Sequence, residues 1–218
     1  PKVRELAESF GVQWLRLDQL YTSKPDKRQF KPFYAGPQGK GTLHAAMLAE
    51  ALLLWETVLV EDRSIGDFID ADYTWVNERL AKHYGFDAAQ VTVLAKTDGD
   101  DAVAGGMPNR ELPKKPDDGS WTRVRLVDRR RGGVLTLGAT LTLSSVPTRT
   151  SPVKRGAWVL EPIFNRPPKE PKIAVAPLGQ AATDDAWLSV RRKLEIHRQN
   201  AACAVCHDRI DPPGFALE

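Results

Sequence analysis

Hydrophobic positions in the first sixty residues recur at helical spacing. Residues 2–20 repeat apolar side chains every three or four positions, which predicts an amphipathic helix. Its expected apolar face comprises Val3, Leu6, Phe10, Trp14, Leu17 and Leu20. Residues 43–61 are apolar on nearly every side, so this segment is predicted to be a buried central helix. A loop containing Phe30, Phe33 and Tyr34 is expected between them, from Pro25 to Pro37.

The next segment combines capping residues with short apolar runs. Ser64 is a suitable N-cap for a short helix through Phe68, and Asp70 or Asp72 for a second one. That second helix is predicted to run to His83 and to end at Tyr84-Gly85.

The predicted secondary structure changes in the middle of the chain, where runs of β-branched residues follow the segments with helical spacing of apolar residues. Residues 91–94 and 122–127 have the composition of short strands, and the Gly-, Pro- and Asp-rich stretch 98–119 between them predicts a long loop. Residues 132–143 fit a strand or a helix about equally.

Helical signals return after residue 150. Ser151-Pro152 is a strong helix start, and Pro162 limits the far end of the helix. Its expected face comprises Val153, Ala157, Leu160 and Phe164. After a proline-rich connector at 165–180, Asp184 or Asp185 is expected to open a last helix that carries Trp187, Val190, Leu194 and Ile196. The predicted fold is therefore mainly α: a helical N-terminal domain with a few short strands and long loops, followed by a helical segment that carries the C-terminal residues.

Composition narrows the range of partners. The chain has 42% hydrophobic and 27% charged residues, typical of a globular protein with a sizeable core. A net charge of +3 gives no reason to expect a nucleic-acid partner. The longest apolar stretch, residues 45–60, is interrupted by Glu50 and Glu56, and we interpret it as too short to span a bilayer.

One motif near the C-terminus carries specific chemistry. Cys203, Cys206 and His207 form a Cys-x-x-Cys-His sequence, and the two cysteines are the only ones in the chain. One helical turn brings both thiols to one face, where they can meet the two vinyl groups of a porphyrin, and the next residue supplies an axial imidazole. The motif predicts one covalent haem c with His207 as the proximal iron ligand.

Besides two thiols that simply lie in a helix, two other interpretations of the cysteines stay open. A thioredoxin-like dithiol or disulfide is one, although such a pair normally follows a strand in a βαβ unit. A structural zinc site is the other, although it needs two further ligands of the soft type that this chain lacks.

The sixth coordination position of the iron decides between electron transfer and chemistry. His197 lies six residues before Cys203 and is the preferred candidate for the distal ligand, with a helix-end histidine as its structural alternative. Met107, in a glycine-rich loop, is a weaker candidate. His44, Met47 and His83 are expected to be packing or helix-end residues.

Neighbouring residues are candidates for supporting roles. Asp208 or Asp211 can accept the Nδ1 hydrogen of His207, and Pro212-Pro213-Gly214 is expected to turn the chain so that Phe215 covers a haem face. Basic residues that can pair with haem propionates, or simply be exposed, are Arg149, Lys154 and Arg155. No residue is assigned a catalytic role, because the polar cluster at 70–79 is equally an N-cap followed by helix surface.

Several long strings resemble a known group of proteins. DADYTWVNERLAKHYG (70–85), RTSPVKRGAWVLE (149–161) and the 203–218 tail are similar to the large secreted cytochrome-like proteins of planctomycetes and related bacteria. Their adjacent regions are DUF1592, the planctomycete-specific domain 4, and DUF1588, the planctomycete cytochrome-like domain 3. The resemblance implies a DUF1592-like helical domain at 1–130 and a DUF1588-like cytochrome-type domain at 131–218. It also implies a C-terminal truncation, since members continue past Glu218.

These observations lead to an expected function. We expect an extracytoplasmic protein, periplasmic or secreted, that transfers electrons through one covalent haem to redox proteins or to other modules of the same parent chain. Covalent haem attachment takes place outside the cytoplasm, so the missing signal peptide indicates a piece of a longer chain. An enzyme with an open iron site and a surface scaffold with a structural haem are the alternatives, distinguished by an open sixth position and by a redox-silent haem, respectively.

Overall fold

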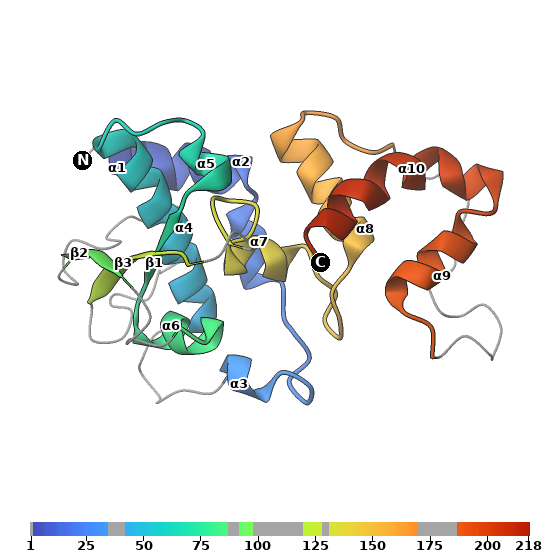
Figure 1. Cartoon of the computed structure of the whole chain (residues 1–218), viewed down its shortest axis with the longest axis horizontal. Coiled ribbons are helices and arrows are strands. Elements are labelled where there is room, and N and C mark those ends of the chain that lie inside the picture. The colour runs from blue at the N-terminus through green and yellow to red at the C-terminus, as the bar shows by residue number, and fades with distance from the viewer. Residues whose placement is uncertain (1, 35–41, 87–91, 98–119, 128–130, 170–186) are drawn as a thin grey trace. The chain divides into compact units, whose positions relative to one another are not determined.

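The computed structural model describes residues 2–34, 42–86, 92–97, 120–127, 131–169 and 187–218 (Figure 1). The chain divides into two compact units, Pro1–Arg149 and Thr150–Glu218, here called the N-terminal and C-terminal units. The fold is mainly α with one small three-stranded sheet, as predicted. The predicted loop at 98–119 lies outside the described residues.

The first segment is not the single amphipathic helix that the spacing predicts. It comprises α1 (Lys2–Leu6), the π-helical turn η1 (Ala7–Gly11), α2 (Val12–Trp14) and the 3₁₀ turn η2 (Leu17–Tyr21). The π turn adds a residue per turn and rotates the register, so Leu6 and Phe10 are exposed while Ala7, Val12 and Leu15 are buried. Leu17 and Leu20 are buried as predicted.

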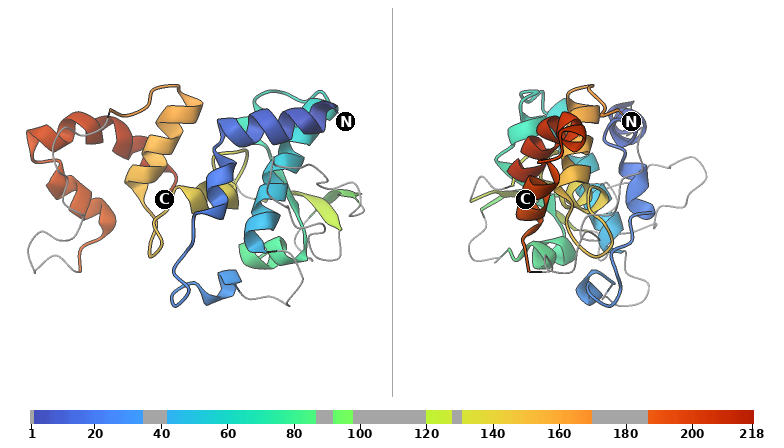
Figure 2. Two further views of the ribbon diagram at one scale, coloured as in Figure 1. Left: turned by 180° about the vertical axis from the view of Figure 1, so that it is seen from behind. Right: turned by 90° about the vertical axis from the view of Figure 1, so that its right-hand side faces the viewer.

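The central helix α4 (Leu43–Val60) forms the core of the N-terminal unit. It runs between the sheet and α7 (Gly138–Leu143), as both ribbon views show (Figures 1 and 2). Trp55 packs against Trp14 and Phe68, with ring centroids 5.6 and 4.4 Å away. With 18 residues, α4 is long and apolar enough to cross a membrane by length and composition, contrary to our interpretation of the stretch as too short. Most of the helix is buried inside the unit, as in the core helix of a globular protein.

The predicted helix that begins at Asp70 or Asp72 is wrong in its first half. Residues Tyr73–Val76 form strand β1, all of them buried, and Asn77 caps helix α6 (Glu78–Tyr84) by accepting a hydrogen bond from the Leu80 amide. Aromatic and β-branched side chains favour a strand here, and pairing with strand β3 (Trp121–Arg125) outweighs the helical spacing. Gly85 ends α6 in the left-handed conformation, as predicted.

The two predicted strands are present. Strands β2 (Val93–Thr97) and β3 (Trp121–Arg125) pair antiparallel, and β3 also pairs with β1, which gives the order β1-β3-β2. The β1–β3 register places Tyr73 opposite Arg125 and Val76 opposite Thr122.

The remaining elements of the N-terminal unit are short. Helix α3 (Lys31–Tyr34) lies in the expected loop, and α5 (Asp67–Asp70) follows a turn in which Ser64 Oγ accepts from the Gly66 amide. The ambiguous segment 132–143 is helical only at its end, in α7. Gly133 has a positive φ, and a Cβ there would overlap the backbone of Ile69, so this turn requires glycine.

A buried carboxyl group ties these elements together. Glu50 of α4 is 1% exposed and accepts hydrogen bonds from Thr74 Oγ1 of β1 (2.6 Å) and Tyr84 Oη of α6 (2.5 Å). Tyr84 Oη also accepts the amide hydrogen of Gly138 at the start of α7. Burial raises the pKa of Glu50 to about 7, against the opposing effect of these hydrogen bonds. Glu50 and Tyr84 together therefore link four segments of the N-terminal unit.

The raised pKa of Glu50 predicts a pH dependence of stability. The folded state holds this proton more tightly than the unfolded state, so the free energy of unfolding should fall as pH rises from about 4.5 to about 7. The contribution is on the order of 3 kcal/mol, since one pKa unit corresponds to about 1.4 kcal/mol. Urea unfolding at several pH values should show this decline in the wild type, and Glu50→Gln should lack it. Equal pH dependence in the two proteins would contradict the prediction.

Candidate functional site

The C-terminal unit is built on a close crossing of two helices. Helix α8 (Pro152–Trp158) packs along α10 (Ala201–Ala216), and both ribbon views show them side by side (Figures 1 and 2). A Cβ on Gly156 would overlap the carbonyl oxygen of Ile210, and a Cβ on Gly214 would overlap that of Pro152. Glycine is required at both positions because the backbones touch, and this contact fixes the C-terminal half of α10.

The start of α8 is as predicted, but its buried face is not. Ser151 Oγ accepts from the Lys154 amide, with Pro152 in the first turn. Pro162 does not end the helix; it lies within the π-helical turn η3 (Val159–Ile163), whose wider hydrogen-bond pattern accommodates it. The buried residues are Pro152, Arg155, Gly156, Trp158 and Val159, whereas Phe164 is exposed.

Arg155 binds the C-terminal end of α10. Its guanidinium is buried and donates to the Leu217 carbonyl oxygen (2.8 Å) and to Glu218 Oε1 (3.0 Å). A cation at a helix C-terminus satisfies carbonyl groups that have no partner within the helix. Arg155 therefore has a structural partner rather than an exposed position from which to reach a propionate. Lys154 is exposed, and Arg149 belongs to the N-terminal unit.

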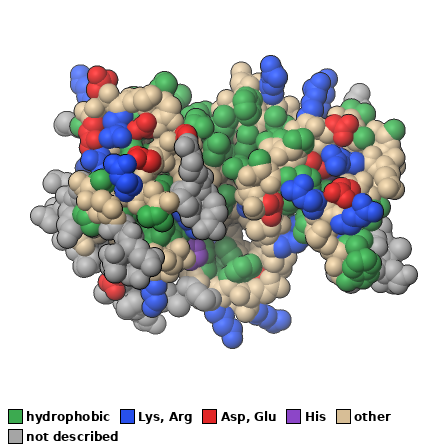
Figure 3. Space-filling view, viewed as in Figure 1, with side chains coloured by type: hydrophobic (Ala, Val, Ile, Leu, Met, Phe, Trp, Pro, Cys, Tyr) green, Lys and Arg blue, Asp and Glu red, His purple; other side chains and the backbone are tan. Residues whose placement is uncertain are grey.

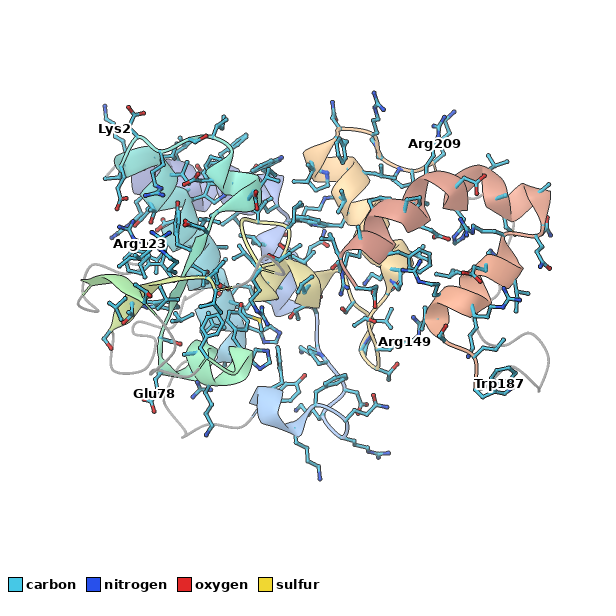
Figure 4. All side chains as sticks on the ribbon, viewed as in Figure 1. Lys2, Glu78, Arg123, Arg149, Trp187 and Arg209 are labelled. Carbon is cyan, nitrogen blue, oxygen red and sulfur yellow. The ribbon has the colours of Figure 1, made fainter. Side chains whose placement is uncertain are left out.

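The helix that leads into the motif is shorter than predicted. Helix α9 spans Val190–His197 and is capped by Ser189, whose Oγ accepts from the Arg192 amide. Asp184 and Asp185 lie outside the described residues. Trp187 precedes the helix and is 81% exposed (Figure 4). Leu194 is the buried anchor of α9.

The Cys-x-x-Cys-His motif lies in the first half of α10. Asn200 caps the helix through the Ala202 amide, and Cys203 and Cys206 follow as free, partly exposed thiols one turn apart. Cys203 and His207 continue the helical stripe that Ile210 and Gly214 bury against α8. The element before the motif is helix α9, not the strand that precedes a thioredoxin-like pair.

His207 is held by a buried carboxylate. Its Nδ1 lies 2.9 Å from Oδ1 of Asp211, one turn further along α10, and Asp211 is 0% exposed. An ionised carboxylate oxygen can only accept, so with Asp211 in that form Nδ1 is the donor and Nε2 of a neutral imidazole has the lone pair. Asp211, rather than Asp208, thus occupies the position predicted for the hydrogen-bond partner of His207. Two adjacent thiols and an imidazole with a free Nε2 are a donor set that fits a c-type haem.

His197 lies beside His207. The two ring centroids are 4.9 Å apart, with the rings inclined by 73° in an edge-to-face contact. Two imidazoles on opposite sides of one metal ion have centroids roughly 6 Å apart, since each nitrogen lies about 2 Å from the metal. A shared iron therefore requires the His197 ring to move outward from its present contact.

Residues 212–215 do not form the predicted turn. Helix α10 continues through Pro212 and Pro213 to Ala216, so Phe215 is helical. The Cζ atom of Arg191 lies over the Phe215 ring, 4.1 Å from its centroid, in a cation–π contact. The lost amide donors would have bonded the carbonyl groups of Asp208 and Arg209, which lie on the exposed side of the helix, where water can replace them. Arg209 projects outward there (Figure 4).

The other ligand candidates come from other parts of the sequence. Met107 is outside the described residues, and His44, Met47 and His83 belong to the N-terminal unit. The ring of His44 hydrogen bonds the Ser23 carbonyl oxygen, and burial lowers the pKa of both His44 and His83. Within the described ranges, no group of three or more His, Cys, Asp and Glu side chains is placed to hold a metal ion. Acidic and basic side chains are interspersed over the face in Figure 3.

Two family models match the sequence. Residues 1–86 match the family PSD4, described as a protein of unknown function (DUF1592), and residues 131–218 match PSCyt3, described as a protein of unknown function (DUF1588). The chain joins a DUF1592 region to a DUF1588 region. No curated protein and no solved structure matches it. The DUF1588 match contains the whole C-terminal unit and begins within the N-terminal unit, before α7.

The helix crossing in the DUF1588 region should not tolerate a single added methyl group. Gly156→Ala places a Cβ against the Ile210 carbonyl, so α8 and α10 must separate, at a cost of roughly 1–3 kcal/mol or more. Thermal or urea unfolding of the full chain measures this cost. Ala216→Ser, on the exposed end of α10, is the control and should change stability little. Equal stability of Gly156→Ala and the wild type would show that the helices are not in backbone contact.

Proposed function

We propose that the DUF1588 region binds one haem c through thioether bonds to Cys203 and Cys206, with His207 as the proximal iron ligand, and that it transfers electrons. The single observation that carries this proposal is the arrangement on α10: two free thiols one turn apart, followed by an imidazole whose Nδ1 is bonded to buried Asp211. The name of the PSCyt3 family points to the same class of protein.

The residues of the chain have separate roles in this proposal. Cys203 and Cys206 hold the porphyrin edge, and partial exposure leaves both thiols accessible for attachment. The ring of His207 is fixed by Asp211, so its Nε2 is available without a change of tautomer. A bound haem supplies reversible one-electron chemistry at its iron.

The position of His197 favours electron transfer over an open catalytic site. Its ring already contacts that of His207, from the helix that leads directly into the motif. A second imidazole on the iron gives a low-spin centre closed to substrates, which suits electron transfer. We therefore propose His197 as the distal ligand, reached by a small outward movement of its ring. The expected setting is the periplasm or the cell exterior, with redox proteins or other modules of the parent chain as partners.

Covalent attachment is the first test of this proposal. The 218-residue chain, matured in a bacterial periplasm with the cytochrome c maturation machinery, should show a haem-stained band after denaturing electrophoresis, and a pyridine haemochrome spectrum typical of two thioether bonds. The double variant Cys203→Ala/Cys206→Ala should lose both signals, because no thiol remains in the chain. A colourless wild type under these conditions would rule out the haem proposal.

The distal ligand is tested in the haem-loaded protein. His197→Ala should shift the absorption spectrum from low spin toward high spin and open the ferrous iron to carbon monoxide, because the sixth position loses its imidazole. Gln199→Ala, an exposed change two residues away, is the matched control and should leave the spectrum unchanged. An unchanged spectrum in His197→Ala would assign His197 a structural role only.

A further inference from the structure

Asp211 is an unusual residue to find fully buried. It lies on the inward side of α10, between Ile210 and Gly214 in the contact with α8, and none of its surface is exposed. Burying a carboxylate is costly unless all of its oxygen atoms have partners. One oxygen of Asp211 accepts from His207, as described above.

The second oxygen of Asp211 is not hydrogen bonded. Oδ2 lies 3.7 Å from Arg198 Nε, too far for a hydrogen bond, and neither atom has another partner among the described residues. Arg198 compensates the charge of Asp211 without a hydrogen bond to Oδ2, so stability of the C-terminal unit alone does not explain why this carboxylate is buried. The hydrogen bond of Asp211 to the ring of His207, the proposed iron ligand, accounts for its position.

We propose that Asp211 is the positioning residue of His207: it fixes the ring with its hydrogen on Nδ1 and lowers the redox potential of an iron bound at Nε2. This inference rests on the proposed haem function. A carboxylate that accepts from the far nitrogen of a ligand imidazole increases the electron density on the ring and favours the oxidised metal. Arg198, 3.7 Å from Oδ2, offsets part of the negative charge without taking up the oxygen that holds His207.

The helix supplies the geometry of this pair. Asp211 follows His207 by four residues, so α10 itself places the carboxylate beside the ring. The Gly156–Gly214 contact holds the same stretch of α10 against α8, which keeps Asp211 out of water. Asp208, one residue from His207, has a 68% exposed side chain, and its Oδ1 lies 3.9 Å from the Arg198 guanidinium.

Asp208 therefore provides a matched control for an experiment on Asp211. Asp211→Asn and Asp208→Asn each remove one negative charge from the same helix. In haem-loaded full-length protein, a spectroelectrochemical titration should give a higher midpoint potential for Asp211→Asn and a nearly unchanged one for Asp208→Asn, because only Asp211 acts through the ligand ring. Asp211→Glu, which retains the carboxylate, should give a midpoint potential closer to that of the wild type than Asp211→Asn does. Equal shifts in the two Asn variants, or none in Asp211→Asn, would overturn the inference.

A second measurement separates this inference from the haem proposal. In haem-free full-length chain, ¹⁵N-correlated NMR of the neutral His207 ring should show the Nδ1–H tautomer in the wild type and in Asp208→Asn. Predominance of the Nε2–H tautomer in the wild type would overturn the inference even if Asp211→Asn does not fold. Failure of the wild type to take up haem would instead reject the proposed function, and the tautomer would still decide whether Asp211 positions the ring.

Discussion

The arrangement of the candidate site depends on backbone contact between α8 and α10. Gly156 and Gly214 let the two helices approach until a carbonyl oxygen of each lies where a side chain would otherwise be. Arg155 reinforces the contact by donating a hydrogen bond to the carbonyl oxygen of Leu217, the C-cap residue of α10. With its C-terminal half fixed in this way, α10 presents Cys203, Cys206 and His207 on the half that remains accessible. The rigid part of the helix also contains Asp211, so the motif and its supporting carboxylate are held by one element.

In the N-terminal unit, a buried carboxyl group on α4 selects one packing arrangement. Helix α4 is apolar on nearly all sides, and such a helix can pack against its neighbours in many rotational settings. Glu50 removes this freedom, because its carboxyl group has partners only where β1 and α6 bring Thr74 and Tyr84 to it. A buried polar group with specific partners thus selects one packing of an otherwise uniformly apolar helix. The burial that this requires also raises the pKa of Glu50.

Both units contain buried carboxyl groups, but the two groups differ in what surrounds them. Both oxygens of Glu50 accept hydrogen bonds, consistent with a structural role. Asp211 has one oxygen hydrogen bonded to a histidine in a metal-ligand motif, and a second oxygen that faces Arg198 at 3.7 Å without a hydrogen bond. Completeness of hydrogen bonding therefore distinguishes the residue that organises a core from the residue that we propose acts on a ligand.

The sequence by itself determined the mainly helical class, the central helix, the β2 and β3 strands and the spacing of Cys203, Cys206 and His207, because each depends on local pattern and short-range geometry. The Ser151 cap and the Gly85 stop were also predictable, since capping is decided within one turn. Tertiary structure decided the rest. Pairing with β3 converted residues 73–76 into a strand, and the π turn at 7–11 moved Leu6 and Phe10 out of the core. Contact with α8 kept residues 212–214 helical, and it buried Asp211, which the helix already places one turn from His207. These outcomes depend on neighbours distant in the sequence, which periodicity and spacing do not record.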